Sequence, residues 1–209
     1  MEIILFSSNK HKANEIENIF SNYKIRLYTD FIEPFDVFEN GNNFKENALL
    51  KVESLKNELD SNMLKNYILM AEDSGICIEK LDNKPGIYSA RYAKIKDFSD
   101  KESILILEDC KDSENLQRVI SELESKNLKS SPAIFISCVA VYKNDRFLST
   151  HGFLSGEVVT KISGENGFGY DPIFIPKGFE KTLASLSQKQ KDSISHRFRA
   201  LELMRLLLK

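Results

Sequence analysis

The segment Glu72-Asp73-Ser74-Gly75 places two carboxylates beside a hydroxyl and a glycine. It follows the apolar run 67–71, which reads as a buried strand, so we expect the acidic pair at a strand-to-turn junction. Binding and catalytic groups often lie at such junctions, and carboxylates there could hold a metal-bound triphosphate. An ordinary polar turn has the same composition, so this segment alone leaves both interpretations open.

A second candidate lies near the amino terminus. The apolar residues 3–6 read as a short buried strand, and a helical spacing of apolar residues begins at Ile16. Between them stands the loop Ser7-Ser8-Asn9-Lys10-His11-Lys12. Such a loop favours phosphate, because free backbone N–H groups and the helix dipole both face an anion there. The glycines of a P-loop are missing from it.

Two further candidates lie in the last third of the chain. In Gly167-Phe168-Gly169-Tyr170-Asp171-Pro172, glycines flank an aromatic ring that could stack on a base. Lys191 precedes Ser195-His196-Arg197, which reads as the start of a C-terminal helix. Each segment also has a structural explanation, since Phe168 could be a core aromatic and Lys191 a surface lysine.

Together these segments resemble the inosine triphosphate pyrophosphatase family, whose members hydrolyse aberrant purine nucleoside triphosphates such as ITP, dITP and XTP. The resemblance spans nearly the whole chain and keeps the family's order. Its six blocks are Ser-x-Asn-x-x-Lys near residue 10, Asn43-Phe44-Lys45-Glu46-Asn47-Ala48, Asp73-Ser74-Gly75, Pro85 to Tyr92, Gly167 to Pro172, and Ser195-His196-Arg197. The resemblance implies an α/β fold, with a long twisted mixed sheet and helices in two lobes around a central cleft. It also implies a Mg²⁺ cofactor and a homodimer.

The resemblance assigns roles to residues as well. Asp73 is the expected catalytic carboxylate, which orients or deprotonates the attacking water directly or through Mg²⁺. Asp73 and Glu39 are the expected metal ligands, with Glu46 and Glu72 as alternatives. The expected substrate-binding residues are Ser7, Ser8, Asn9, Lys10, His11, Lys12, Ser74, Phe168, Gly169, Tyr170, Asp171, Lys191, His196 and Arg197.

Within that set, the hydroxyls and lysines are assigned to the phosphates, Phe168 to stacking on the base, and His196 and Arg197 to the purine edge. Attack of water on the α-phosphorus needs a neutralised triphosphate and an oriented water more than covalent chemistry. The function that the resemblance implies is Mg²⁺-dependent release of pyrophosphate from 6-oxo purine triphosphates. A pyrophosphatase with a pyrimidine or other modified-base preference, and a non-catalytic nucleotide-binding protein, stay open as alternatives.

The bulk properties agree with this function. The 209 residues are expected to form a single domain, residues 1–209, in two lobes, with a surface insertion at about residues 98–114. A net charge of −2 disfavours a nucleic-acid partner, and no apolar run is long enough to span a membrane. The three scattered cysteines read as reduced thiols of a cytoplasmic protein.

Local patterns predict the elements that position these groups. We expect strands at 3–6 and 24–28, a polar loop over 30–42, and helices over 43–59 and 114–126. The strongest hairpin pattern joins strands 134–142 and 147–160 across Asn144-Asp145.

Overall fold

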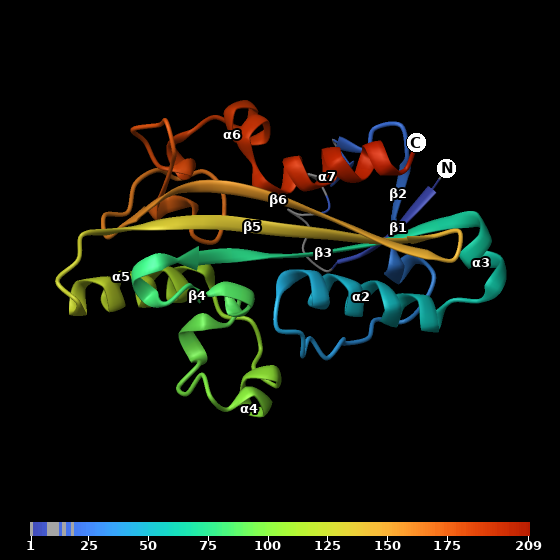
Figure 1. The fold of residues 1–209 in the computed structure, drawn as a ribbon, viewed down its shortest axis with the longest axis horizontal. Coiled ribbons are helices and arrows are strands. Elements are labelled where there is room, and N and C mark those ends of the chain that lie inside the picture. Colours follow the sequence, from blue (N-terminus) through green and yellow to red (C-terminus); the bar gives the residue numbers. More distant parts are fainter. Residues whose placement is uncertain (1, 8–12, 14–15, 18) are drawn as a thin grey trace. The chain divides into compact units, whose positions relative to one another are not determined.

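The computed structural model describes residues 2–7, 13, 16–17 and 19–209 (Figure 1). Within these residues, seven strands form a sheet of order β2-β1-β3-β5-β6-β7, and β4 pairs with β3. The strands are β1 (Glu2–Phe6), β2 (Lys24–Leu27), β3 (Tyr67–Ile78), β4 (Lys84–Pro85), β5 (Ser130–Lys143), β6 (Arg146–Val159) and β7 (Phe174–Pro176). The α-helices that lie wholly within the described residues are α2 (Phe44–Glu58), α3 (Ser61–Asn66), α4 (Lys101–Leu105), α5 (Asp112–Ser125), α6 (Gln188–Ile194) and α7 (His196–Leu207).

The sheet is mixed, which confirms the expected α/β fold. Strand β1 runs parallel to β2 and to β3, with Ile3 opposite Ile68 and Leu5 opposite Met70. Strands β4 and β7 run antiparallel to β3 and β6. The apolar residues 3–5 of β1 are fully buried, as expected of a short strand inside a parallel arrangement.

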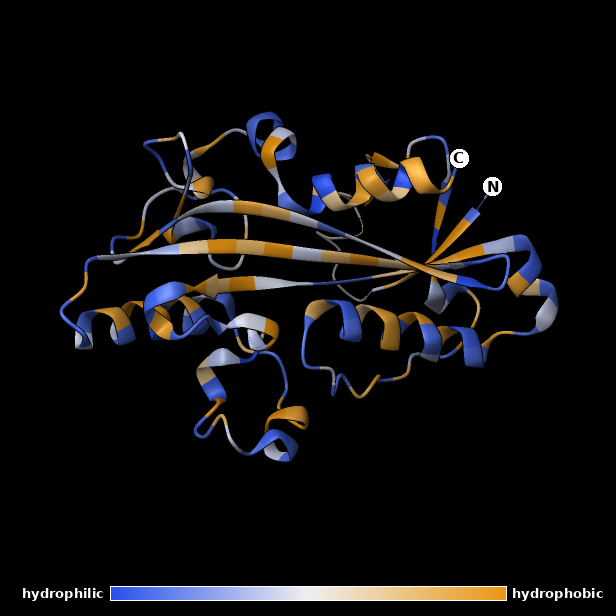
Figure 2. Cartoon of the chain, in the orientation of Figure 1, coloured by the Kyte–Doolittle hydropathy of each residue, from blue (hydrophilic) through white to orange (hydrophobic). Residues whose placement is uncertain are grey.

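The hairpin prediction is confirmed. Strands β5 and β6 are neighbours in the sheet and are joined by Asn144 and Asp145, whose φ angles are 49° and 59°. Two consecutive positive φ angles suit the twist of a tight hairpin, and Asn and Asp tolerate them better than most residues. Figure 2 shows the apolar character of β5, which begins at Ser130, earlier than expected.

The prediction of a turn at residues 72–75 is wrong. Strand β3 continues through the acidic pair to Ile78 because the chain beyond it keeps an apolar pattern, with Ile76 and Ile78 both fully buried. Successive side chains of a strand point to opposite faces of the sheet. Glu72 and Asp73 therefore project from opposite faces instead of sharing one turn.

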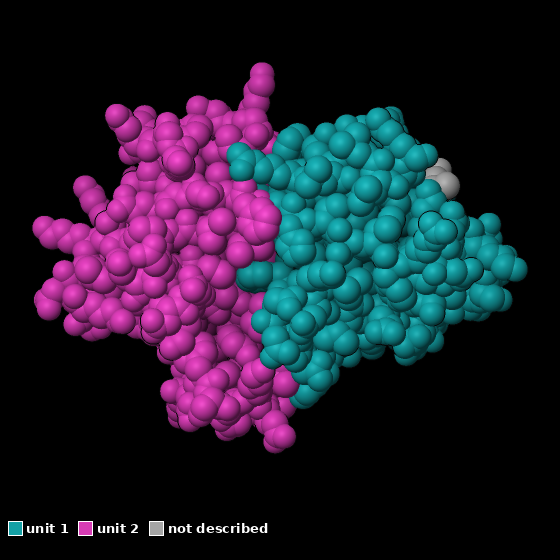
Figure 3. Space-filling model, viewed as in Figure 1, with its two compact units in different colours: residues 1–73, 137–152, 196–209 teal, residues 74–136, 153–195 magenta. Residues whose placement is uncertain are grey.

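The chain divides into two compact units (Figure 3). Unit 1 comprises residues 1–73, 137–152 and 196–209, and unit 2 comprises residues 74–136 and 153–195. The long strands β3, β5 and β6 contribute residues to both units. No helix among the described residues is both long and apolar enough to cross a membrane.

The core of unit 1 lies between the sheet and its helices. On one face, Ile68 and Met70 of β3 pack in a buried cluster with Leu201 and Met204 of α7. Helix α2 lies on the opposite face and buries Ala48, Val52 and Leu55, the apolar positions expected of helix 43–59 (Figure 1). Unit 1 therefore has a helix over each face of the strand segment that carries the acidic pair.

The core of unit 2 is built around α5, which confirms the helix expected over 114–126. Its buried residues Leu116, Val119 and Leu123 share a cluster with Ile76 and Phe174. The stretch before α5 contains the short helix α4, and Ile106 after it is 76% exposed. That residues 98–114 are an insertion relative to the family stays a prediction.

Candidate active site

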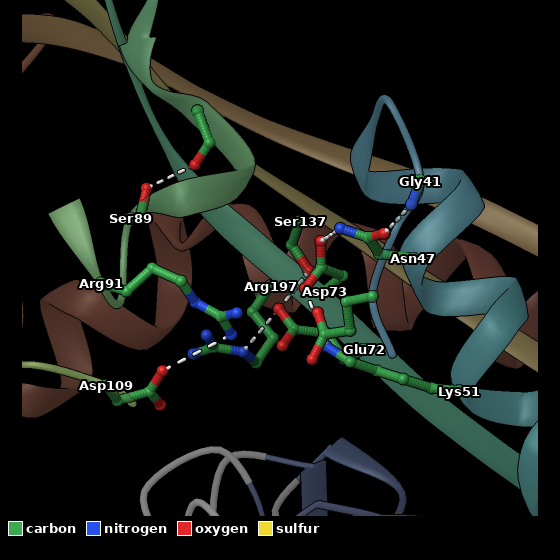
Figure 4. Close-up of polar contacts among 12 residues, drawn as sticks. Gly41, Asn47, Lys51, Glu72, Asp73, Ser89, Arg91, Asp109, Ser137 and Arg197 are labelled. Atoms are coloured by element: carbon green, nitrogen blue, oxygen red, sulfur yellow. Dashed lines mark hydrogen bonds and ion pairs between the residues drawn. The ribbon is translucent and has the colours of Figure 1, made fainter. Parts of the chain in front are cut away.

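The two acids expected to bind metal share one cation. Lys51 Nζ of α2 lies 2.8 Å from Asp73 Oδ1 (Figure 4). The same ammonium lies 2.9 Å from Glu39 Oε2. Burial alone would lower the pKa of Lys51, but the carboxylates of Asp73 and Glu39 raise it above its usual value. The ammonium therefore stays charged, and unit 1 holds a cation between the two carboxylates.

Helix α2 presents two side chains to Asp73. Lys51 and Asn47 are four residues apart and lie on the same helix face. Asn47 Nδ2 donates to Asp73 Oδ2 at 3.4 Å, and Asn47 Oδ1 accepts from the backbone N–H of Gly41 at 2.9 Å. The helix begins where Asn43 Oδ1 accepts from the backbone N–H of Glu46. This cap fixes the first turn, from which Asn47 reaches the strand.

Sequence reasoning missed Lys51 and Asn47. Asn47 lies inside the block Asn43-Phe44-Lys45-Glu46-Asn47-Ala48, and Lys51 follows it at the helical spacing of four. That spacing indicates one shared face of the predicted helix, but it does not indicate that this face contacts Asp73.

Glu72 belongs to a different cluster, on the other face of β3. Its Oε1 lies 3.2 Å from Arg197 Nε and accepts a 2.7 Å hydrogen bond from Ser137 Oγ of β5 (Figure 4). Both side chains of the ion pair are 2% exposed. The structure therefore gives Arg197 a buried carboxylate partner, and its expected contact with the purine edge stays a prediction.

The first turn of α7 packs closely against strand β6. A Cβ at Gly152 would lie 1.9 Å from the His196 carbonyl oxygen, so only glycine allows the helix to approach this closely. Thr150 Oγ1 donates to the Ala200 carbonyl at 2.7 Å. Helix α7 therefore begins with half-buried His196 and buried Arg197, and its first turn packs against the part of β6 that belongs to unit 1.

In unit 2, the segment expected to bind the base is a turn whose Asp171 forms an ion pair with a lysine of α6. Gly167 and Gly169 have φ angles of 95° and 59°, and Asp171 is buried. Lys191 Nζ of α6 lies 2.7 Å from Asp171 Oδ2, so the structure brings together two of the predicted substrate-binding residues. A Cβ at Gly167 would lie 2.1 Å from that same carboxylate oxygen.

Two other residues of this segment form hydrogen bonds with residues outside it. The Tyr170 hydroxyl donates to the Ser89 carbonyl at 2.8 Å, and burial raises the pKa of Tyr170. The Gly169 backbone N–H donates to Asp112 Oδ2 at 2.7 Å. Phe168 is partly buried. Its stacking role stays a prediction.

The remaining substrate-binding predictions concern the first loop and β3. Ser7 directly follows β1, and Ser74 is a half-buried residue of β3. Ser8, Asn9, Lys10, His11 and Lys12 lie outside the described residues. Their contacts with phosphates stay predictions.

Within the described part of the chain, no group of three or more His, Cys, Asp and Glu residues is arranged to hold a metal ion. The carboxylates of Asp73 and Glu39 nevertheless fit Mg²⁺ chemically. Mg²⁺ takes oxygen ligands, keeps several waters and needs only one or two carboxylates beside substrate phosphates.

Comparison with known proteins shows which family shares this architecture. The Ham1 family profile matches residues 3–206. The chain is 43% identical over 209 residues to a dITP/XTP pyrophosphatase of Campylobacter jejuni, with 100% of this chain and 98% of that protein covered. It is 42% identical to a dITP/XTP pyrophosphatase of Nautilia profundicola, with the same coverage.

A solved structure agrees with these relatives. The Staphylococcus aureus Ham1 protein matches the fold with a TM-score of 0.81 and 35% identity, covering 100% of this chain and 98% of that one. The resemblance drawn from the six ordered blocks is therefore confirmed at the level of the family and the fold. The chain belongs to the Ham1 family.

Proposed function

We propose that the protein is a Mg²⁺-dependent pyrophosphatase that converts aberrant purine triphosphates, among them dITP, XTP and ITP, to the monophosphate and pyrophosphate. Such an activity removes damaged purines from the nucleotide pool. The observation that carries the proposal is the convergence of Asp73 and Glu39 on one partly buried cation, Lys51. Two relatives at 42–43% identity are dITP/XTP pyrophosphatases, which supports the substrate class.

The metal would be held by Asp73 and Glu39. Bound there, Mg²⁺ would neutralise triphosphate charge and make a coordinated water more acidic. Asp73 accepts or directs the proton of the attacking water, because it is the carboxylate that α2 contacts with both a cation and an amide donor. Lys51 would add a fixed positive charge beside these two carboxylates, where negative charge develops on a bound triphosphate.

The orientation of Asp73 is the second requirement of this chemistry. Lys51 binds one of its carboxylate oxygens and Asn47 the other, so the carboxylate is restrained in its plane. Restraint of a reacting group lowers the entropy that is lost in the transition state. Helix α2 and the middle of strand β3 are regular elements, so they can hold the Asp73 carboxylate in this orientation.

Base selection would depend on hydrogen-bond polarity. Hypoxanthine and xanthine present an acceptor at position 6 and a donor at N1, whereas adenine reverses both. A donor such as His196 or Arg197 near position 6 would face another donor in adenine. Each buried group left unpaired costs about 1 to 3 kcal/mol, which suffices for strong rejection of ATP.

We also propose that residues 1–209 form a single domain with two lobes around a cleft, acting as a homodimer in the cytoplasm. The three described cysteines are free thiols, which supports a reducing compartment. Analytical ultracentrifugation of the purified protein would test the dimer.

A product assay tests the activity itself. The purified protein is incubated with XTP, dITP, ITP, GTP, ATP and dTTP in the presence of Mg²⁺, and the products are separated by anion exchange. We expect monophosphate and pyrophosphate, with XTP, dITP and ITP consumed fastest. Orthophosphate and a diphosphate as first products would refute the proposal. A preference for dTTP would indicate the pyrimidine alternative, and binding without turnover would indicate a non-catalytic protein.

A further inference from the structure

We infer that Asn47 is a positioning residue that fixes the separation and orientation of the two carboxylates, Asp73 and Glu39. The inference rests on the proposed function, because it concerns the site at which that function places the metal. Asn47 itself would touch neither metal nor substrate. It acts through the backbone beside Glu39 and through the carboxylate of Asp73.

The contacts of Asn47 link two segments that are far apart in the chain. Its side chain accepts from the N–H of Gly41 at 2.9 Å, two residues after Glu39. Its amide nitrogen donates to Asp73 Oδ2 at 3.4 Å, across 26 residues of sequence. One side chain on α2 therefore contacts the loop that carries one acid and the strand that carries the other.

Burial makes these contacts important. Asn47 is 1% exposed, so water cannot easily replace a partner that is lost. A primary amide has one acceptor end and one donor end, and here both ends are engaged at the site. The amide of Asn47 thus accepts from Gly41 and donates to Asp73 at once.

Gly41 supports the same inference. A Cβ at this position would lie 2.5 Å from Asn47 Oδ1 and 2.7 Å from the Cβ of Glu46. Gly41 thus lets the loop backbone press against the amide of Asn47. A larger residue would push the loop, and Glu39 with it, away from α2.

Asn47 and Lys51 hold the carboxylates by different means. The ammonium of Lys51 attracts both acids, but a divalent cation at the same carboxylates would compete with it for their charge. The amide of Asn47 is neutral and is not repelled by such a cation. Its contacts can therefore define the spacing of the acids both with and without metal.

The rest of the loop is anchored independently, so a variant at position 47 should fold. The backbone N–H of Asn42 donates to Glu46 Oε2 at 2.7 Å. Earlier in the loop, the Phe35 ring packs 5.1 Å from Phe6 and 5.7 Å from Tyr28. Loss of the Asn47 side chain would thus loosen the segment around Glu39 without releasing the whole loop.

The test uses Mn²⁺ alone, whose binding is read by electron paramagnetic resonance without nucleotide. Asn47→Ala removes both contacts, whereas Asn47→Asp keeps an acceptor for Gly41 and removes the donor to Asp73. Asn57→Ala and Asn57→Asp are the matched controls, because Asn57 is an exposed residue of the same helix. Circular dichroism and thermal unfolding show which variants are folded.

We expect Asn47→Ala to weaken Mn²⁺ binding about 10-fold or more, the usual effect of removing a group that orients a metal ligand. Asn47→Asp keeps the anchor of the loop but places a carboxylate, instead of an amide donor, beside Asp73 Oδ2. We expect its kcat to stay low, because Asp73 has lost its donor and meets a like charge. Both Asn57 variants should have the Mn²⁺ affinity and the kcat of the wild-type protein. The inference would be overturned if folded Asn47→Ala bound Mn²⁺ as tightly as the wild-type protein. It would also be overturned if Asn47→Asp had the kcat of the wild-type protein.

A second measurement separates this inference from the proposed function. Amide hydrogen exchange at Gly41 should accelerate in Asn47→Ala and not in Asn47→Asp or Asn57→Ala. If the unchanged protein neither binds Mn²⁺ nor releases pyrophosphate, the proposed function fails, whatever the exchange result. If exchange at Gly41 is equal in Asn47→Ala and the unchanged protein, the positioning role fails, whatever the activity.

Discussion

Arg197 and Glu72 form a buried ion pair in unit 1, with Arg197 Nε 3.2 Å from Glu72 Oε1 and both side chains 2% exposed. Ser137 Oγ donates to the same carboxylate oxygen. Two charges taken out of water are costly unless they compensate each other. The pair therefore couples the first turn of α7 to the middle of β3.

Removal of one partner of this pair should destabilise the protein strongly. We expect Arg197→Ala to lower the free energy of unfolding by about 3 to 5 kcal/mol, because it leaves the Glu72 carboxylate buried without its cation. The double variant Glu72→Gln with Arg197→Met should lose less, since no charge is left uncompensated. Urea unfolding of the three proteins measures both effects.

Arg205 provides the control on the same helix. Its ion pair with Glu202 spans 2.9 Å but is about one third exposed. Arg205→Ala should therefore cost at most about 1 kcal/mol. If Arg197→Ala and Arg205→Ala lost the same free energy of unfolding, burial of the Arg197–Glu72 pair would have no energetic consequence.

The role of Asp73 is tested by Asp73→Asn, which removes a charge and nearly keeps the shape. We expect kcat for XTP or ITP to fall about 10²-fold or more, the contribution of a typical general acid or base. Folding should survive, because Lys51 still pairs with Glu39. Steady-state kinetics and thermal unfolding distinguish a lost catalytic group from a lost fold.

An active Asp73→Asn variant would move the role to another acid. Glu72→Gln is then informative, because Glu72 lies on the opposite face of β3 and pairs with Arg197. We expect its main effect to be on stability.

Metal removal should abolish the activity. Carboxylates alone cannot neutralise a triphosphate, so EDTA should stop pyrophosphate release and excess Mg²⁺ should restore it. The assay is the coupled detection of pyrophosphate. Full turnover in chelator would contradict the assignment of Asp73 and Glu39 to a metal.

The thiol of Cys138 should be unreactive in the folded protein. Burial, with the nearby carboxylates of Asp73 and Glu72, raises the pKa of Cys138 to about 12. Because only the thiolate reacts, about 10⁻⁴ of this thiol is reactive near pH 8. We expect iodoacetamide to leave Cys138 unlabelled in the folded protein and to label it in guanidinium, as read by peptide mass spectrometry. Rapid labelling in the folded state would refute this.

The predicted stacking role of Phe168 has a distinct kinetic signature. Phe168→Ala should raise KM for purine triphosphates alike, because every base has a π face and stacking contributes about 1 to 3 kcal/mol per base. The ratio of kcat/KM for ITP over ATP should stay constant. Phe153→Ala, at a residue that is 45% exposed in the same unit, is the control. A changed ratio would assign Phe168 to selectivity instead.

The sequence by itself determined the local elements. The apolar residues of β1, the spacing of Ala48, Val52 and Leu55 in α2, and the residues Asn144 and Asp145 of the hairpin each specify their structure through neighbours in the chain. Helical periodicity and turn preferences depend on nearby residues, so they can be read from the sequence. The ordered blocks likewise indicated the family before any geometry was known.

Tertiary structure alone decided how the acidic residues are used. The strand extends past Ala71 because Ile76 and Ile78 enter a core formed with distant residues, and this extension sends Glu72 and Asp73 to opposite faces. Arg197 meets Glu72 across 125 residues of sequence, a partnership that no local pattern encodes. Pairing between distant residues depends on strand register and helix packing, so only the folded chain reveals Lys51 and Asn47 beside Asp73.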